Sequence, residues 1–395
     1  TDHPVSRLSL LRGVDRPIEL ERGGYDLPSR LADSLFWLGR YVERADGLAR
    51  LMRAIARRLT EETSPNGSPE LGALMAALEA VAPAAALPDG TVPSSDPSDD
   101  YEVRLLAAID DGARPSSLRS GLENARRLAT IVRDRVSIDT WRVVNQLRRT
   151  LSDEPGASGV ADASSAMAVL DDLSVPLAAF QGYTAESMTR GVGWRFLDMG
   201  RRIERAAGLA AVLDTLLTRP GAHQAVGAVD GEMDERPGPD ERAVLDAALE
   251  VAASVMTYRS RYRAGVAAVP VIDLLVMDET NPRSIAYQLV ALRDHTDELP
   301  RPATAGDRAD EQRLTLGLLA AMQLSTAHDL ATVDGMGVRG ALGNLAAKID
   351  AELPAVSDAI TRRYLSHAQP SRSLGRNTPP IDLDPELTGD EETTL

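Results

Sequence analysis

The chain has 395 residues, a formal net charge of −16 and no cysteine. The acidic balance argues against nucleic-acid binding, because neutralising phosphates needs a basic surface, and the lack of cysteine excludes disulfides, thiol catalysis and thiolate metal sites. No apolar run approaches the roughly 20 residues that cross a bilayer and no signal peptide is visible, so we expect a cytoplasmic protein that does not bind membranes.

Helix-forming residues fill most of the chain and alternating strand patterns are nearly absent, which predicts an all-α fold. Residues 1–28 are polar and interrupted by proline and glycine, and we expect a linker or docking arm there. The first residue is Thr1 rather than methionine, which suggests a portion of a longer polypeptide. A long helix should start at Pro28 and Ser29, with serine as its N-cap, and run to about residue 59.

Turn signals delimit further helices in the first predicted half, residues 29–217. We expect a helix over 70–82, one over 101–110, one capped by residues 115–117 and ending near 135, and one over 137–151. A helix over 164–189, interrupted at Pro176, leads into a second long helix. Residues 83–99 and 152–163 should be flexible loops.

Glycine, proline and acidic residues over 218–240 predict a flexible linker before the second half, residues 241–366. That half should contain helices over 241–263, 270–279, 281–297, 307–330 and 338–364. Gly335, Gly337 and Gly340 match G-x-G-x-x-G without a preceding strand, so we interpret them as a glycine-rich turn. The acidic, proline-containing residues 367–395 should be a disordered tail.

Two of the predicted helices repeat one another. When Gly39 is aligned with Gly200, residues 39–49 and 200–210 are identical at all but three of eleven positions, and both carry G-R-x-x-E-R. Such a match indicates an internal duplication. We therefore predict a helical bundle built from two duplicated halves related by a pseudo-twofold axis, with the two repeated helices facing one another.

The repeated motif places one glutamate, Glu43, at the edge of an apolar helical stripe, between Gly39 and Gly47. A helical glycine costs roughly 1 kcal/mol relative to alanine, so something should approach the helix backbone closely at both glycines of each copy. A buried carboxylate left unpaired costs several kcal/mol. Arg40 can pair with Glu43 on the same helix, whereas Arg44 points toward a different neighbour.

Two interpretations of the motif stay open. In the structural one, interhelical glutamate–arginine bridges only fix the register of the bundle. In the functional one, the glutamates hold or deprotonate a substrate amine, with a pKa raised by burial, and arginines hold a substrate carboxylate. The catalytic candidates are Glu43 and Glu204, and the substrate-binding candidates are Arg40, Arg44, Arg201 and Arg205.

A second cationic set contains Arg259, Arg263 and Arg283, followed by Ser284. It is either a solvated helix end with cation–π stacking or an anion subsite next to the glutamates, where a helix start presents backbone N–H groups. The histidines have no metal-ligand spacing, and an arginine follows each motif glutamate and opposes a bound cation. We expect no metal or cofactor site in this chain.

The segments ADSLFWLGRYVERADGLARL, GWRFLDMGRRIERAAGLAAVL, YRSRYR and NPRSIAYQL resemble the bacterial alpha-E family, an all-helical domain with a repeated E-R motif. The resemblance covers roughly residues 27–365. The family's characteristic residues carry over as Arg40, Glu43 and Arg44, as Arg201, Glu204 and Arg205, and as Arg283 with Ser284.

Alpha-E proteins are commonly encoded beside, or fused behind, a circularly permuted ATP-grasp ligase, often with a transglutaminase-like protein nearby. The resemblance therefore implies ATP-dependent amide or peptide bond formation, with ATP and Mg²⁺ bound by the ligase. This chain would be the C-terminal part of such a fusion and would bind the acceptor amine or the acyl product. The resemblance supplies no reaction for the alpha-E domain itself, and a non-catalytic interaction module is the alternative.

Overall fold

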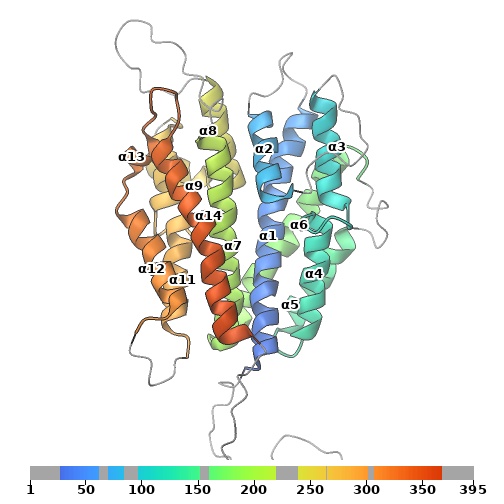
Figure 1. Cartoon of the computed structure of the whole chain (residues 1–395). Coiled ribbons are helices and arrows are strands. Elements are labelled where there is room, and N and C mark those ends of the chain that lie inside the picture. Colours follow the sequence, from blue (N-terminus) through green and yellow to red (C-terminus); the bar gives the residue numbers. More distant parts are fainter. Residues whose placement is uncertain are drawn as a thin grey trace, which may run out of the picture.

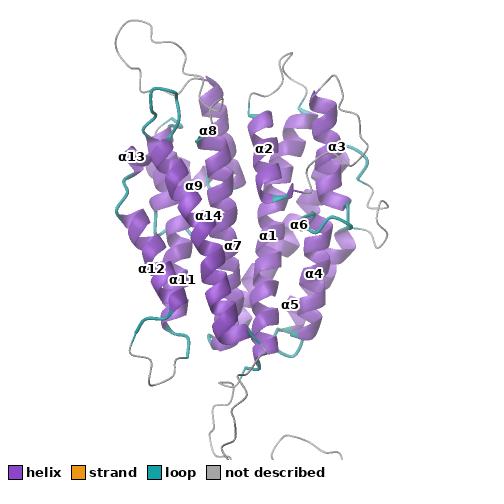
Figure 2. Cartoon of the chain, viewed as in Figure 1, coloured by secondary structure: helices purple, strands orange, loops and turns teal. Residues whose placement is uncertain are grey.

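The computed structural model describes residues 27–61, 70–83, 97–151, 160–218, 239–263, 265–300 and 307–366. These residues form helices, and none of them lies in a β-strand (Figure 2). The all-α prediction is confirmed. The tail predicted over 367–395 falls outside the described residues, as do most of the arm over 1–28, the linker over 218–240 and the loops over 83–99 and 152–163. The last two residues of the predicted linker, 239 and 240, are already helical.

Two long helices, α1 (Ser29–Thr60) and α7 (Val192–Leu217), lie side by side in the middle of the molecule (Figure 1). They are the two predicted repeat helices. Each has apolar residues at spacings of three and four, and this stripe turns inward because one helix face must leave water. The buried stripe of α1 is Leu35, Leu38, Val42, Ala45, Ala49 and Met52, and that of α7 is Phe196, Met199, Ile203, Ala206, Ala210 and Leu213.

One group of helices surrounds α1. It consists of α2 (Leu71–Val81), α3 (Pro97–Asp110), α4 (Leu118–Ile131), α5 (Ile138–Thr150) and α6 (Ala163–Ser187). Helices α4 and α6 pack directly on α1, and α5 packs on both of them. Ser117 and Ser137 start α4 and α5, because each hydroxyl accepts a hydrogen bond from a backbone N–H of the first turn.

A second group lies on the far side of α7 (Figure 1). It consists of α8 (Pro239–Val251), α9 (Val255–Tyr262), α10 (Ala268–Ile272), the π-helical turn η2 (Asp273–Met277), α11 (Ile285–Asp297), α12 (Asp310–Gln323), α13 (Ala327–Ala331), α14 (Gly340–Ile360) and the π-helical turn η3 (Thr361–Leu365). Helices α11 and α14 pack against α7, and η3 reaches α1. The duplication of whole halves stays a prediction.

Four predicted helix boundaries are wrong. Pro28 rather than Ser29 is the N-cap of α1, and Pro176 lies inside an unbroken α6. Predicted helix 241–263 is two helices, because Ala253 adopts the left-handed conformation (φ 51°) that ends α8. Predicted helix 307–330 also breaks, where Thr326 caps α13.

The glycine-rich match lies in a turn at Gly335 and Gly337, as predicted, and its last residue, Gly340, begins α14. The carboxylate of Asp334 accepts hydrogen bonds from the backbone N–H groups of Met336 and Val338, each at 2.9 Å. Gly337 has a positive φ of 77°, a conformation that glycine adopts without steric cost.

Helix α6 has the length and composition of a bilayer-spanning helix, alone among the described residues and contrary to the expectation from sequence. It packs beside α1 and α5. Its buried face contains Leu170, Leu173, Leu177 and Phe180. The core of the bundle accounts for these apolar residues.

Candidate functional site

The backbones of α1 and α7 touch at a reciprocal pair of glycines. A Cβ atom on Gly39 would lie 2.1 Å from the carbonyl oxygen of Leu197, and one on Gly200 would lie 2.1 Å from that of Phe36. The predicted close approach is confirmed at these two positions. It is wrong for Gly47 and its counterpart in α7, Gly208, where such a Cβ would meet no other atom within 4 Å.

This contact lets the arginines of α1 reach the glutamate of α7. The Nε atom of Arg40 donates to Glu204 Oε2 at 2.8 Å, and the Nε atom of Arg44 donates to Glu204 Oε1 at 2.5 Å. The predicted Arg40–Glu43 pair within one helix is wrong. With no side chain at the crossing, the helices lie close enough for Arg40 to bind the glutamate across the interface instead.

The reverse pair joins the arginines of α7 to Glu43 of α1. Arg205 donates to both carboxylate oxygens of Glu43, from Nε at 2.5 Å and from Nη2 at 2.8 Å. The Nε atom of Arg201 lies 3.6 Å from Glu43 Oε2. Each glutamate therefore takes its counter-charges from the opposite helix, and the structure has the interhelical bridges of the structural interpretation.

These two interhelical groups, here called the crossed pairs, differ in burial: the Glu43 pair is Glu43 with Arg201 and Arg205, and the Glu204 pair is Glu204 with Arg40 and Arg44. The side chain of Glu43 is 3% exposed, whereas Glu204 is 12% and Arg44 31% exposed. Burial raises the pKa of Glu43, but the charges of Arg205 and Arg201 outweigh it, so this pKa lies below its usual value. A general base at neutral pH needs the opposite shift, and the geometry therefore speaks against Glu43 as a proton acceptor.

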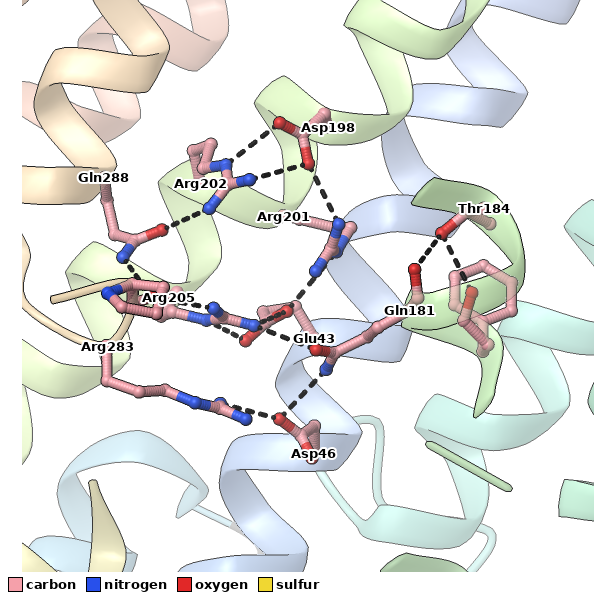
Figure 3. A network of polar contacts seen from close by, with 12 residues as sticks. Glu43, Asp46, Gln181, Thr184, Asp198, Arg201, Arg202, Arg205, Arg283 and Gln288 are labelled. Atoms are coloured by element: carbon pink, nitrogen blue, oxygen red, sulfur yellow. Dashed lines mark hydrogen bonds and ion pairs between the residues drawn. The ribbon is translucent and has the colours of Figure 1, made fainter. Parts of the chain in front are cut away.

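A second carboxylate, Asp46, extends the network around Glu43 (Figure 3). It accepts hydrogen bonds from Arg50 at 2.5 Å, from Arg283 at 3.2 Å and from Gln181 at 3.2 Å. Burial and the nearby charges of Arg205 and Arg50 lower the pKa of Arg283 to about 10. Arg283 thus lies near Glu43, as the anion-subsite interpretation expects, but it already donates a hydrogen bond to Asp46.

A third carboxylate, Asp198, links this network to α11. Arg201 Nη1 and Arg202 Nε each donate to it at 2.9 Å, and His295 Nε2 lies 2.8 Å from it. Arg202 also donates to Gln288 of α11 at 3.0 Å. Burial raises the pKa of Asp198, but the hydrogen bond to His295 and the arginine charges outweigh it and keep the carboxylate ionised.

Sequence reasoning missed Asp46, Asp198 and Arg202 as members of the site. A signal for them was present, because Asp46 lies four residues before Arg50, and Asp198 three and four residues before two arginines. These are the spacings at which helical side chains meet. Gln181, Gln288 and His295 lie far from the motif in sequence, and no local spacing indicates them.

The surroundings of Glu204 are aromatic instead. The guanidinium of Arg40 lies 4.9 Å from the ring centre of Trp37, and that of Arg44 lies 5.7 Å from the ring centre of Tyr41. In the repeat, Trp37 and Tyr41 occupy the positions of Asp198 and Arg202. Two guanidinium groups thus face one carboxylate in a setting that is partly exposed at Arg44, which favours an additional anion.

The second predicted cationic set is not assembled. Arg259 and Arg263 are exposed on and after α9, and within the described part of the chain neither is bonded to the glutamate cluster. Ser284 is fully buried as the N-cap of α11. Its hydroxyl accepts from the N–H of Tyr287 at 3.0 Å and donates to the carbonyl of Asp278 at 2.5 Å, so it serves the helix start rather than a substrate.

Neither motif glutamate lines the cleft that the structure shows beside α1. This cleft lies between α1 and α4, and Trp37 and Tyr41 form part of its wall. Among the described residues, no group of three or more histidine, aspartate or glutamate side chains has the arrangement of a metal site.

Comparison with known proteins fits this geometry. The family model Alpha-E, described as "a predicted alpha-helical domain with a conserved ER motif", matches residues 27–365. Proteins of Mycobacterium bovis and of two Mycobacterium tuberculosis strains, each named "Uncharacterized protein", are 32% identical over 346 residues. The match covers 85% of this chain and 37% of the length of each relative. No solved structure matches significantly.

The E-R motif of the family description is present twice, as Glu43-Arg44 and as Glu204-Arg205, at the centre of the bundle. The chain belongs to the Alpha-E family.

Proposed function

We propose that the chain is the helical, substrate-positioning module of an ATP-dependent amide or peptide ligase system. The unequal burial of the two crossed pairs carries this proposal. The Glu43 pair fixes the helices in one register. The half-exposed Glu204 pair holds a carboxylate of the acceptor or of the acyl product for a circularly permuted ATP-grasp ligase, which binds ATP and Mg²⁺.

The surroundings of Glu43 support a structural role for that half. Its carboxylate is sealed from solvent, held ionised, and bonded to Arg205 through both oxygens. A substrate amine would have to displace a buried guanidinium to reach it. Breaking a buried ion pair costs about 3–5 kcal/mol, which is too much for a routine binding step.

The surroundings of Glu204 support a binding role for the other half. Arg40 and Arg44 give this position a net positive charge, and Arg44 is the most exposed member of either crossed pair. Guanidinium groups bind carboxylates in a planar, often bidentate geometry. Glu204 would align the two arginines, and a substrate carboxylate would bind their solvent side.

The ligase partner is supported by the family resemblance and by chain length. The match leaves more than half of each mycobacterial relative outside it, which gives room for a ligase domain as in fused alpha-E proteins. Because the proposed ligase would consume ATP, we expect the system in the cytoplasm, with a transglutaminase-like protein as a second partner.

Reconstitution tests the proposal. The purified chain is mixed with the circularly permuted ATP-grasp ligase proposed as its partner, and amine-dependent ATP consumption and product mass are measured. We expect the chain to raise the ligation rate. Arg44→Gln should raise the KM for the carboxylate substrate about tenfold, a loss of about 1.4 kcal/mol in binding, and lower the Tm much less than Glu43→Gln does.

Arg142→Gln is the matched control, because Arg142 is 74% exposed on α5 and, among the residues that the structure describes, bridges only to Asp139 in its own helix. It should leave the rate and the KM unchanged. A ligase whose rate is the same with and without this chain would refute the proposal.

A further inference from the structure

A cleft of about 370 Å³ opens between α1 and α4. Its apolar walls are Trp37 and Tyr41 from α1, and Leu128 and Ile131 from α4. The volume lies at the lower end of the range of about 300–1,000 Å³ that small-molecule sites span. Since a water occupies about 30 Å³ in the liquid, the cleft has room for about a dozen waters or one small organic molecule.

The charged residues of the cleft favour an anionic ligand. Arg30 from α1 and Arg127 from α4 line it, together with one carboxylate, Asp33. Within the described part of the chain neither arginine is ion-paired, and Arg127 has only a 3.3 Å hydrogen bond to Asn124. Asp33 already has another polar partner. The cleft therefore contains two guanidinium groups and one carboxylate that already has a polar partner, so its net charge is positive.

The aromatic wall connects this cleft to the Glu204 pair. Trp37 and Tyr41 are the rings over which Arg40 and Arg44 stack. A ligand that lies against these rings is therefore adjacent to the arginines that hold Glu204. The cleft and the Glu204 pair form one continuous face of α1, with cations at both ends and aromatic rings between them.

We propose that this cleft binds a short carboxylate-bearing amide, such as an N-acyl amino acid or a dipeptide with an apolar side chain. The side chain packs on Trp37 and Tyr41, and the carboxylate binds Arg30 and Arg127, so the cleft takes the acyl product while the Glu204 pair holds the carboxylate of the acceptor. The inference rests on the proposed function and names the substrate class that the module presents to the ligase. A ligand with either part alone would use only half of the cleft.

Indole NMR signals of the full-length chain test the proposal. The sequence has three tryptophans, so Trp37→Phe assigns the signal of Trp37, and Trp194, which lies edge-to-face against His295 of α11, serves as the internal reference. Titration with N-acetyl-phenylalanine should shift the Trp37 signal and leave that of Trp194 in place. N-acetyl-phenylalanine amide, which lacks the carboxylate, should bind at least tenfold more weakly.

Substitution separates this site from nonspecific attraction. Arg127→Gln should weaken N-acetyl-phenylalanine binding at least tenfold, whereas the control Arg142→Gln should not change it. The proposal is overturned if the Trp37 signal does not move, if the acid and its amide bind equally, or if inorganic phosphate at equal concentration displaces the acid.

The same variants separate this inference from the proposed function. A chain that stimulates the ligase but does not bind the acid in this cleft refutes the cleft assignment alone. A chain that binds the acid here but does not stimulate the ligase refutes the proposed function and leaves the cleft assignment standing.

Discussion

At the scale of single residues, the charge of Glu43 is maintained by groups that the opposite helix supplies. Arg205 donates hydrogen bonds to both of its carboxylate oxygens, and the Nε atom of Arg201 lies 3.6 Å from one of them. All three side chains are at most 10% exposed. Removing the negative charge leaves the buried guanidinium of Arg205 without its ion-pair partner and Arg201 with Asp198 alone, which is the costly way to break a buried pair.

Glu43→Gln keeps the shape of the side chain and removes its charge. We expect the free energy of unfolding at pH 7 to fall by about 3–5 kcal/mol, measured by chemical denaturation. Glu204→Gln should cost less, because Glu204 and Arg44 are partly exposed to water and water screens their interaction. Equal losses in the two variants would contradict the difference in burial.

The pH dependence of stability in Glu43→Gln tests whether the loss comes from the ionised carboxylate. The folded-state pKa of Glu43 lies below its ordinary value of 4.5, so its contribution to stability is complete above about pH 4.5 and is lost as the pH falls further. Glu43→Gln should therefore flatten the acid side of the stability profile. Some slope should persist, because the pKa values of Asp46 and Asp198 are also lowered.

At the scale of elements, the crossing of α1 and α7 depends on the missing side chains of Gly39 and Gly200. Gly39→Ala and Gly200→Ala would each place a methyl group 2.1 Å from a backbone oxygen. Because backbone cannot move aside as a flexible side chain can, the helices must separate. We expect each change to lower the free energy of unfolding by about 3 kcal/mol or more.

Gly47→Ala and Gly208→Ala are matched controls on the same two helices. No other atom lies within 4 Å of the added Cβ, so the higher helix propensity of alanine should raise the free energy of unfolding by up to about 1 kcal/mol. Thermal denaturation of the four variants tests whether alanine destabilises the chain at Gly39 and Gly200 but not at Gly47 and Gly208. If Gly39→Ala is tolerated as well as Gly47→Ala, the helices do not cross at this glycine.

The helix pair also shows what sequence can predict. The apolar stripes, the burial of the motif and the close approach at Gly39 follow from spacing along one helix. Spacing does not tell which of two glycines faces the partner, and it assigned Gly47 to the crossing wrongly. It likewise paired Arg40 with Glu43, because the choice between a neighbour in one helix and a carboxylate across the interface depends on the interhelical distance.

Other features of the site depend on contacts between distant segments. Ser284 belongs to a motif that sequence assigned to substrate binding, yet a helix start and the carbonyl of Asp278 use its hydroxyl. The left-handed Ala253 gave no signal, since alanine rarely ends a helix in this way. His295 could be connected to Asp198 only after α7 and α11 were placed side by side.

At the scale of the whole molecule, α7 is shared by both groups of helices. It packs against α1 and α2 on one side and against α11 and α14 on the other. A boundary drawn after residue 217 therefore passes through a continuous core. The two predicted halves are adjacent in sequence, but neither buries the apolar stripe of α7 alone.

We expect the chain to unfold in one cooperative transition, with equal calorimetric and van't Hoff enthalpies. A fragment of residues 27–218 should lack a native near-ultraviolet circular dichroism signal, because its α7 would expose the face that α11 and α14 cover. Two resolved calorimetric transitions, or a folded fragment, would show that the halves are independent.

Because each glutamate takes its counter-charges from the opposite helix, the two copies of the motif cannot mutate independently. An inverted charge in one copy has no remedy among its own neighbours and needs a matching inversion in the other copy. We therefore expect substitutions in one copy of the motif to be tolerated only together with matching substitutions in the other. The neighbouring positions do not have this constraint, and one copy has Asp198 and Arg202 where the other has Trp37 and Tyr41.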